Sequence, residues 1–284
     1  MEEKKKRPKI SVIMGVYNGA DLLDEAIESV RAQSFQDWEF VICDDASTDN
    51  TWEKLVEWSH KDPRIIVIRN EKNLKLAATL NKCLEVSTGI YIARMDADDY
   101  SYPWRFKMEN EFLDVNTTYA FVSGQVNALI GRKIVERYWE RKAYPIKRDF
   151  LEGSQFIHPA TMFRRGPLVK VGGYRVAPET TRLEDYDLFM RLYAAGYEGH
   201  NLHRSVLRYT VVNKPVPYKY RIDEAKVRYR GFKSLGLLPK GILHVFRPLL
   251  VGLFPQDVLW EMKTDDKRRK KKKKYDDWDS DFKF

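Results

Sequence analysis

The sequence predicts an α/β fold with a mostly parallel, Rossmann-like central sheet that is covered by helices on both faces. Over the first hundred residues, short apolar runs rich in β-branched side chains alternate with segments whose apolar residues recur at helical spacing. The strand-like runs are apolar at nearly every position, which is typical of strands buried on both faces. Polar clusters follow these runs directly, as at the ligand-binding edge of a parallel sheet.

The elements of the N-terminal part follow one another as strand, helix, strand. Short loops between them are typical of parallel βαβ units. Asp21 is the predicted N-cap of the first helix, because it precedes the first apolar residues at helical spacing. Strands are predicted over residues 10–16, 38–43, 65–68 and 90–93, and helices over residues 22–30, 51–59 and 76–86.

Beyond residue 100 the pattern is less regular. The last helix predicted there carries Glu184, Asp185 and Asp187 in its first turn. The helix dipole favours carboxylates at that end, so capping is one interpretation of this trio. A helix is predicted over residues 103–113, strands over 120–126 and 161–163, a loop over 138–150, and this last helix over 183–195.

An acidic run follows the strand predicted over residues 90–93. Arg94-Met95-Asp96-Ala97-Asp98-Asp99 holds three carboxylates in close succession. Such carboxylates repel one another and persist mainly where a divalent cation or hydrogen-bond donors neutralise them. Oxygen ligands suit Mg²⁺ or Mn²⁺. The alternative is a solvated acidic turn that caps the next helix. Tyr17-Asn18 and Asp44-Asp45 also follow strands, so all three clusters are expected at one edge of the sheet.

The length allows one large domain or one domain with appendages, and the composition predicts a cytoplasmic protein. Of the 284 residues 43% are apolar, with seven Trp, sixteen Tyr and fourteen Phe, enough for a packed core. Cys43 and Cys83 lie in apolar segments without metal-ligand spacing, so they are expected to be small core residues in a reducing compartment. The basic N-terminus lacks the apolar core of a signal peptide. No stretch approaches the roughly 20 apolar residues that span a bilayer.

The C-terminal part combines an apolar segment with a basic run. From residue 242 to residue 260 apolar side chains lie on nearly all sides of a helix, interrupted by Arg247, Pro248 and Pro255. Eight consecutive basic residues follow, Lys267 to Lys274, and they account for much of the net charge of +9. Together these features predict association with an anionic membrane surface, at about 1 kcal/mol per basic residue. The alternative is a pair of helices packed on the domain and followed by a disordered tail.

Four separated motifs follow one another along the chain: Ser11-Val12-Ile13-Met14-Gly15-Val16-Tyr17-Asn18, Asp44-Asp45-Ala46-Ser47-Thr48-Asp49-Asn50-Thr51, Asp96-Ala97-Asp98-Asp99 and Glu184-Asp185-Tyr186-Asp187. In this order they resemble the motifs of the family 2 glycosyltransferases, inverting enzymes with the GT-A fold. The resemblance covers about residues 8–210, and the segments His158 to Arg165 and Gly172-Gly173-Tyr174 also resemble family segments.

The resemblance implies a role for each of these motifs. Asp185 matches the family's general base, which takes the proton of the acceptor hydroxyl. Asp98 and Asp99 match the metal-binding DXD element, whose cation stabilises the departing diphosphate. The donor site implied by the resemblance consists of Val16, Tyr17, Asp45, Asp96 and Asp98, with Asp45 at the N3 edge of a uracil-type base. The acceptor region implied by it includes His158 and Glu184.

The resemblance also implies an organisation and a reaction. A nucleotide-sugar-binding half (8–115) and an acceptor-binding half (116–235) follow a basic arm (1–7), and amphipathic membrane-proximal helices (236–263) precede a charged disordered tail (264–284). The expected reaction is the inverting, Mn²⁺- or Mg²⁺-dependent transfer of a sugar from a UDP-sugar to a hydroxyl acceptor. A lipid-linked saccharide is the expected acceptor, in surface-polysaccharide synthesis at the inner face of the cell membrane.

Two departures from the family pattern leave roles open. Many relatives have Gly where this chain has Lys75, whose side chain either touches phosphate or points to water. The His of the family's Tyr-Arg-x-His segment has no counterpart in Leu207-Arg208-Tyr209-Thr210.

Two other functions remain open. A sugar-phosphate nucleotidyltransferase would open with a Gly-rich basic loop, which the segment Tyr17 to Asp21 is not. A non-catalytic scaffold could bind nucleic acid or membrane through its basic run, but that run lacks interleaved aromatic residues, so no nucleic-acid partner is expected.

Overall fold

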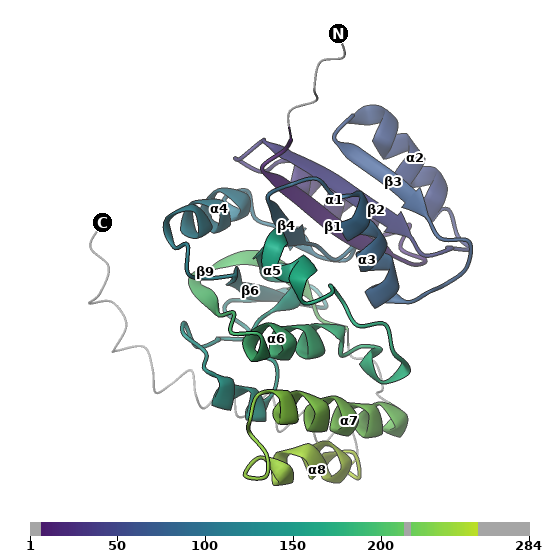
Figure 1. Ribbon diagram of the computed structural model, residues 1–284. Coiled ribbons are helices and arrows are strands. Elements are labelled where there is room, and N and C mark those ends of the chain that lie inside the picture. Colours follow the sequence, from purple (N-terminus) through teal and green to yellow (C-terminus); the bar gives the residue numbers. More distant parts are fainter. Residues whose placement is uncertain (1–6, 213–216, 255–284) are drawn as a thin grey trace.

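The computed structural model describes residues 7–212 and 217–254, and within them nine strands form one sheet (Figure 1). Their order is β3-β2-β1-β4-β8-β6-β9-β5, with β7 beside β6. The strands are β1 (Ile10–Val16), β2 (Trp38–Asp44), β3 (Ile65–Arg69), β4 (Tyr91–Arg94), β5 (Tyr100–Ser101), β6 (Phe121–Ile130), β7 (Lys133–Val135), β8 (Thr161–Arg164) and β9 (Gly199–Thr210).

The first four strands are parallel, as their apolar runs predict. β1 pairs with β2 on one side and with β4 on the other, and β2 pairs with β3. β8 is antiparallel to both β4 and β6, whereas β9 is parallel to β6. Because β4 returns beside β1 after the chain has moved out to β3, the strand order reverses between β1 and β4. In open α/β sheets the crevice beyond the carboxyl ends of the strands at such a point is the usual ligand site.

Helices cover both faces of the sheet. Val12 and Met14 face the core beneath α1, α2 and α4, whereas Ile13 faces the core that contains α3 and α6. This alternation follows from the two-residue period of a strand and explains why β1 is apolar throughout. The helices are α1 (Leu23–Arg31), α2 (Thr51–Lys61), α3 (Leu76–Val86), α4 (Arg105–Val115), α5 (Arg165–Lys170), α6 (Glu184–Ala194), α7 (Tyr218–Ser234) and α8 (Ile242–Val251).

The C-terminal helices lie together at one end of the molecule. α6, α7 and α8 follow one below another in Figure 1, so the predicted helical extension is present as far as residue 254. Among the helices of the two described segments, none combines the length and the apolarity of a bilayer-spanning segment. The predictions for residues 1–6, for the end of the helical extension and for the charged tail lie outside the described residues.

Two element predictions need correction. Asp21 is not an N-cap, since α1 begins at Leu23 with Leu22 in the cap position and without a side-chain cap. The loop predicted over residues 138–150 ends in a 3-10 helix, η1 (Lys147–Glu152). Two further short turns of this kind, η2 (His158–Ala160) and η3 (Pro178–Thr180), precede α5 and α6.

Candidate active site

The acidic run leaves β4 beside β1 and keeps its carboxylates together. The Met95 N–H donates to the carbonyl of Ile13 at 3.1 Å, which fixes the start of the run at the carboxyl edge of the sheet. Asp96, Asp98 and Asp99 each offer an oxygen within 4.8 Å of the other two. Asp99 is buried, whereas Asp96 and Asp98 are partly exposed. Three carboxylates therefore converge on one point that solvent can reach.

Asp99 uses only one of its two carboxylate oxygens. The Thr210 N–H at the end of β9 donates to Asp99 Oδ1 at 2.9 Å, and the Thr210 hydroxyl donates to the Asp98 carbonyl. Within the described part of the chain, Asp99 Oδ2 is buried and accepts no hydrogen bond. Burial, followed by repulsion from Asp96 and Asp98, raises the pKa of Asp99 well above its usual value. A hard divalent cation fits this set, because it would satisfy the orphaned oxygen and offset the repulsion.

Arg94 is the buried cation at the centre of the site. Its side chain is 3% exposed, its Nη1 forms an ion pair with Asp96, and its Nε has no hydrogen-bond partner among the described residues. Burial raises the pKa values of Asp99, Glu184 and Asp185, and the positive charge of Arg94 offsets part of each rise. The charge of Arg94 thus acts on the acidic run and on the first turn of α6, which are about 85 residues apart in sequence.

The first turn of α6 contributes two carboxylates to this region. Burial raises the pKa of Glu184 to about 7, and the charge of Asp185 adds to the rise. Burial also raises the pKa of Asp185. The hydrogen bond from the Tyr186 N–H and the charge of Arg94 both oppose this rise, because they stabilise the ionised carboxylate. Asp187 is different, because it pairs with Arg191 at 2.6 Å and with Arg175 at 3.3 Å. The charges of the acidic-run region therefore act on Glu184 and Asp185. Asp187 instead links α6, through Arg191, to the segment before α6 that carries Arg175.

His158 lies in a closed part of the same region. It is 5% exposed, and its Nε2 lies 2.8 Å from the hydroxyl of Tyr174. Burial, with a contribution from Arg94, lowers the pKa of His158 well below its usual value. His158 is thus neutral at physiological pH and supports Tyr174, which agrees better with a structural role than with proton transfer to solvent.

Helix α3 holds the loop that carries Tyr174. The Asn81 amide donates to the Tyr174 carbonyl at 2.7 Å and accepts from the Tyr174 N–H at 2.8 Å. Gly173 has a φ of +60°, and a Cβ there would lie 2.6 Å from Asn81 Oδ1. Both facts explain the glycine before Tyr174, because only glycine adopts this backbone at such close approach to α3 without strain.

The predicted nucleotide-binding residues lie at the ends of β1 and β2. The Asp45 N–H donates to the Val16 carbonyl at 2.8 Å, so the two loops leave the sheet together. Val16 is 4% exposed and Tyr17 is 48% exposed. The Asp45 carboxylate already accepts from the Asn70 amide at 2.7 Å and from the N–H groups of Leu74 and Lys75 at 2.7 and 2.9 Å. Asp45 therefore fixes the loop before α3.

Lys75 has an unusual backbone for a residue with a side chain. Its φ is 71° and its ψ is 163°, a region that is populated almost only by glycine and costs other residues about 1–3 kcal/mol. The N–H bond to Asp45 requires this conformation at the N-terminus of α3. The glycine of many relatives at this position would adopt it freely. This chain therefore retains a strained, exposed lysine beside the predicted donor site.

Replacing Lys75 with glycine is expected to raise the free energy of unfolding by about 1 kcal/mol, since relief of strain exceeds the entropy cost of glycine. Denaturant unfolding measures this change. Lys72→Gly is the matched control, because Lys72 is exposed and lacks a positive φ, and it should not stabilise the protein. Equal destabilisation by both substitutions would contradict the expectation. UDP affinity of the Lys75 variant separates a phosphate contact, which weakens binding, from a side chain in water.

Sequence reasoning missed three residues of the site and misassigned one. The missed residues border the acidic run: Arg94 pairs with Asp96, and the Thr210 N–H donates to Asp99. Tyr209 is the third, because burial and then the charges of the acidic run raise its pKa. The position of Arg105 directly behind the acidic run in the sequence predicts that, together with Trp104, it packs against the run and neutralises it. Arg105 instead forms a buried ion pair with Glu109 at 3.1 Å. The position of Arg94 directly before three aspartates was the available signal.

Comparison with known proteins shows the family of the chain. The family model described as Glycosyl transferase family 2 matches residues 11–172. "Putative glycosyltransferase EpsE" of Bacillus subtilis (strain 168) is 34% identical over 261 residues, covering 89% of this chain and 92% of that protein. "UDP-Glc:alpha-D-GlcNAc-diphosphoundecaprenol beta-1,3-glucosyltransferase WfaP" of Escherichia coli is 27% identical over 239 residues, covering 80% of this chain and 82% of that protein.

A solved structure shows the same fold. The crystal structure of S. aureus TarS residues 1–349 in complex with UDP-GlcNAc superposes with a TM-score of 0.67 at 19% identity, covering 84% of this chain and 73% of that chain. The family match spans β1 to the turn after α5 and includes the acidic run. The chain belongs to glycosyl transferase family 2 and has its GT-A fold.

Proposed function

We propose that this glycosyltransferase moves a sugar, with inversion, from a UDP-sugar to a hydroxyl of a lipid-linked saccharide in surface-polysaccharide synthesis. One observation carries the proposal. Arg94 pairs with Asp96 of the acidic run and its charge also acts on Asp99 and Asp185, which supports one site for the groups that would hold the leaving diphosphate and activate the acceptor.

The donor side of the proposed site consists of three loops at the carboxyl edge of the sheet. Val16 and Tyr17 border the base, and Asp45 offers its carboxylate to the base while holding the loop before α3. Asp96 belongs to the sugar-nucleotide side, and Asp98 and Asp99 would hold Mn²⁺ or Mg²⁺. Such a cation supplies positive charge next to the diphosphate oxygens on which negative charge develops.

The acceptor side of the proposed site is the first turn of α6 with Tyr174 and His158 behind it. The acceptor oxygen attacks the anomeric carbon as the bond to the diphosphate oxygen breaks, and the proton of the hydroxyl passes to the Asp185 carboxylate. Glu184 lies beside the base and, with a pKa of about 7, is partly protonated near neutral pH. His158 and Tyr174 form a buried floor that keeps water away from this face.

The proposed acceptor and location rest on the C-terminal end of the molecule. Several apolar residues of α8 are exposed, and the basic run Lys267 to Lys274 follows α8 in the sequence. An apolar surface next to basic residues favours the interface of an anionic membrane. The name of the related WfaP specifies a diphosphoundecaprenol-linked acceptor. These features support a peripheral enzyme at the inner face of the cell membrane that acts on lipid-linked saccharides.

A transfer assay tests the proposal. Purified protein is incubated with Mn²⁺, membranes and a panel of radiolabelled UDP-, GDP- and dTDP-sugars, and label is followed into the organic-extractable fraction. We expect label from a UDP-sugar, its loss with EDTA, and a β-linked product from an α-linked donor. Transfer from a GDP-sugar alone would contradict the donor, and a product with retained configuration would contradict the mechanism.

A further inference from the structure

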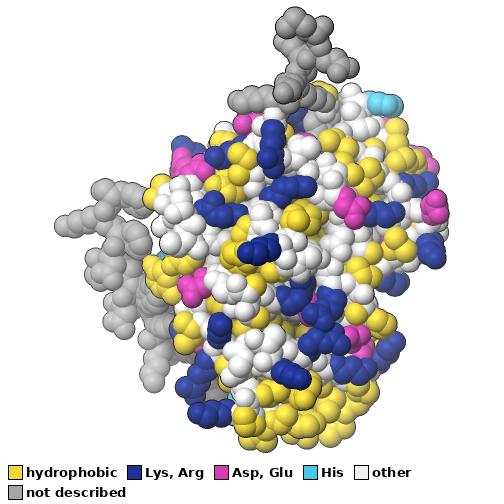
Figure 2. Space-filling view, in the orientation of Figure 1, with side chains coloured by type: hydrophobic (Ala, Val, Ile, Leu, Met, Phe, Trp, Pro, Cys, Tyr) yellow, Lys and Arg dark blue, Asp and Glu magenta, His cyan; other side chains and the backbone are white. Residues whose placement is uncertain are grey.

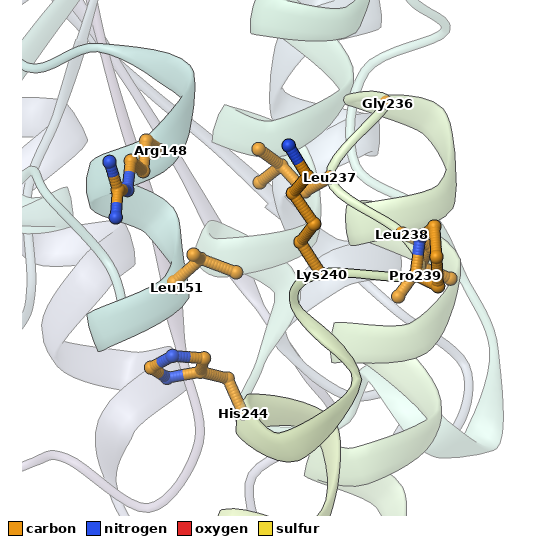
Figure 3. A pocket seen from close by; sticks show the side chains of 8 residues that line it. All are labelled: Arg148, Leu151, Gly236, Leu237, Leu238, Pro239, Lys240 and His244. Carbon is orange, nitrogen blue, oxygen red and sulfur yellow. The ribbon is translucent and has the colours of Figure 1, made fainter.

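A cavity of about 530 Å³ lies among the C-terminal helices, and no residue of the acidic run lines it (Figure 3). It is bounded by η1, by the turn between α7 and α8, and by the first turn of α8. Its walls are largely apolar and its polar groups are cationic or imidazole. The lining residues are Arg148, Leu151, Gly236, Leu237, Leu238, Pro239, Lys240 and His244.

Two cations of this cavity lack an acidic partner. Neither Arg148 nor Lys240 forms an ion pair with any described carboxylate, and both side chains are exposed. Glu152 is the nearby acid, but it pairs with Arg247 at 2.6 Å and lies 3.8 Å from His244 Nδ1. The cavity thus offers two free positive charges and one imidazole above an apolar wall. An anion attached to an apolar chain matches this combination.

The cavity lies next to an exposed apolar stripe on α8. Leu243, Phe246 and Leu250 recur at helical spacing and are 78%, 51% and 63% exposed. Leu253 and Phe254 continue the stripe with exposures of 72% and 58%. Figure 2 shows the broad hydrophobic surface that results at this end of the molecule, with basic side chains at its margin. A surface of this size and composition indicates a membrane or protein contact.

We propose that the cavity binds the phosphate headgroup of a membrane lipid, with Arg148 and Lys240 on the phosphate oxygens and the α8 stripe in the bilayer interface. The inference rests on the proposed membrane association and adds a headgroup site to it. The first carbons of the lipid chain could pack against the apolar wall of Leu151, Leu237 and Leu238. Free phosphate has no apolar group to cover this wall, so the wall would stay in contact with water.

Vesicle binding of the full-length protein tests this site. Phosphatidylcholine vesicles containing phosphatidic acid, whose phosphate is exposed, are compared with vesicles containing phosphatidylglycerol at the same zeta potential. The basic run responds to charge density and treats the two alike. We expect wild-type protein to bind the phosphatidic acid vesicles about tenfold more tightly, because the uncapped phosphate offers Arg148 and Lys240 more negative charge and more free oxygens than the glycerol-capped phosphate. Arg148→Glu combined with Lys240→Glu should abolish this preference.

Controls separate the site from general membrane affinity. Arg132→Glu with Lys133→Glu makes the same charge change at the exposed β6–β7 turn and should keep the preference. Leu243→Asn should weaken binding to both vesicles and leave their ratio unchanged. Equal binding of wild-type protein to both vesicles would overturn the site while leaving membrane association intact. Full competition by inorganic phosphate at the headgroup concentration would overturn a lipid ligand. Mn²⁺-dependent UDP binding by the charge-reversed variant shows that its fold and donor site are intact.

Discussion

Replacement of Asp185 with asparagine is expected to lower kcat by about 1,000-fold and to leave UDP affinity unchanged. Asparagine has nearly the same shape but cannot take a proton, and a positioned general base typically contributes about 10²–10⁴-fold. Steady-state transfer kinetics measure kcat, and titration calorimetry with UDP and Mn²⁺ measures donor binding. A fall in both quantities would indicate a distorted site, and an unchanged kcat would exclude Asp185 as the base.

Glu184→Gln is the matched control for this prediction. It makes the same chemical change one residue earlier in the same turn of α6, and a smaller loss of kcat identifies Asp185 as the base. A pH profile adds a second readout. A base must be ionised, so a raised pKa moves the acidic limb of kcat/KM to higher pH. Because Glu184 is the member of the pair whose pKa is raised to about 7, Glu184→Gln should leave the acidic limb in place, whereas Asp185→Asn should remove it.

Replacement of Asp98 with asparagine is expected to weaken Mn²⁺-dependent UDP binding by about 100-fold or more. The substitution removes one of the three clustered carboxylates that would hold the cation, and loss of a charged ligand weakens a site made of oxygen atoms. Calorimetry with UDP, with and without Mn²⁺, measures the effect. UDP binding of equal strength in Mn²⁺ and in EDTA would contradict a metal-dependent donor site.

Asp37→Asn controls for the loss of negative charge. Asp37 is exposed and lies at the opposite end of the strands, just before β2. Its substitution should leave UDP affinity unchanged. Asp99→Asn is informative in another way, since it neutralises a buried carboxylate with an orphaned oxygen. We expect Asp99→Asn to bind UDP weakly even though its Thr210 contact survives through the amide oxygen.

The sequence was sufficient for the parallel half of the fold. β1, β2 and β4 are apolar at almost every position because both of their faces are covered, and such runs are recognisable without context. β9 was not predicted, although it is twelve residues long. Its residues include His203, Arg204 and Arg208, whose polar character hides the strand. Only pairing with β6 and β5 makes this segment a strand, and that pairing is not local.

Some residues of the candidate site can likewise be recognised from local sequence, and others depend on non-local contacts. Motifs identified the carboxylates, because three aspartates in close succession are chemically conspicuous. Thr210 and Tyr209 were not recognised, since their importance depends on where the end of β9 lies relative to Asp99. The two alternative functions are set aside by the family match over residues 11–172, which includes the acidic run. Neither the nucleotidyltransferase nor the non-catalytic scaffold explains that match.

Helix α3 has a consequence for how the affinities of the two proposed ligands depend on each other. The helix begins directly after Lys75, whose N–H donates to the Asp45 carboxylate. The middle of the helix carries Asn81, whose amide donates to the Tyr174 carbonyl. In the proposed site, a nucleotide bound at Asp45 and an acceptor bound near Tyr174 would therefore meet two parts of one helix. Thermodynamic linkage then requires that whatever the nucleotide does to acceptor affinity, the acceptor does to nucleotide affinity by an equal factor.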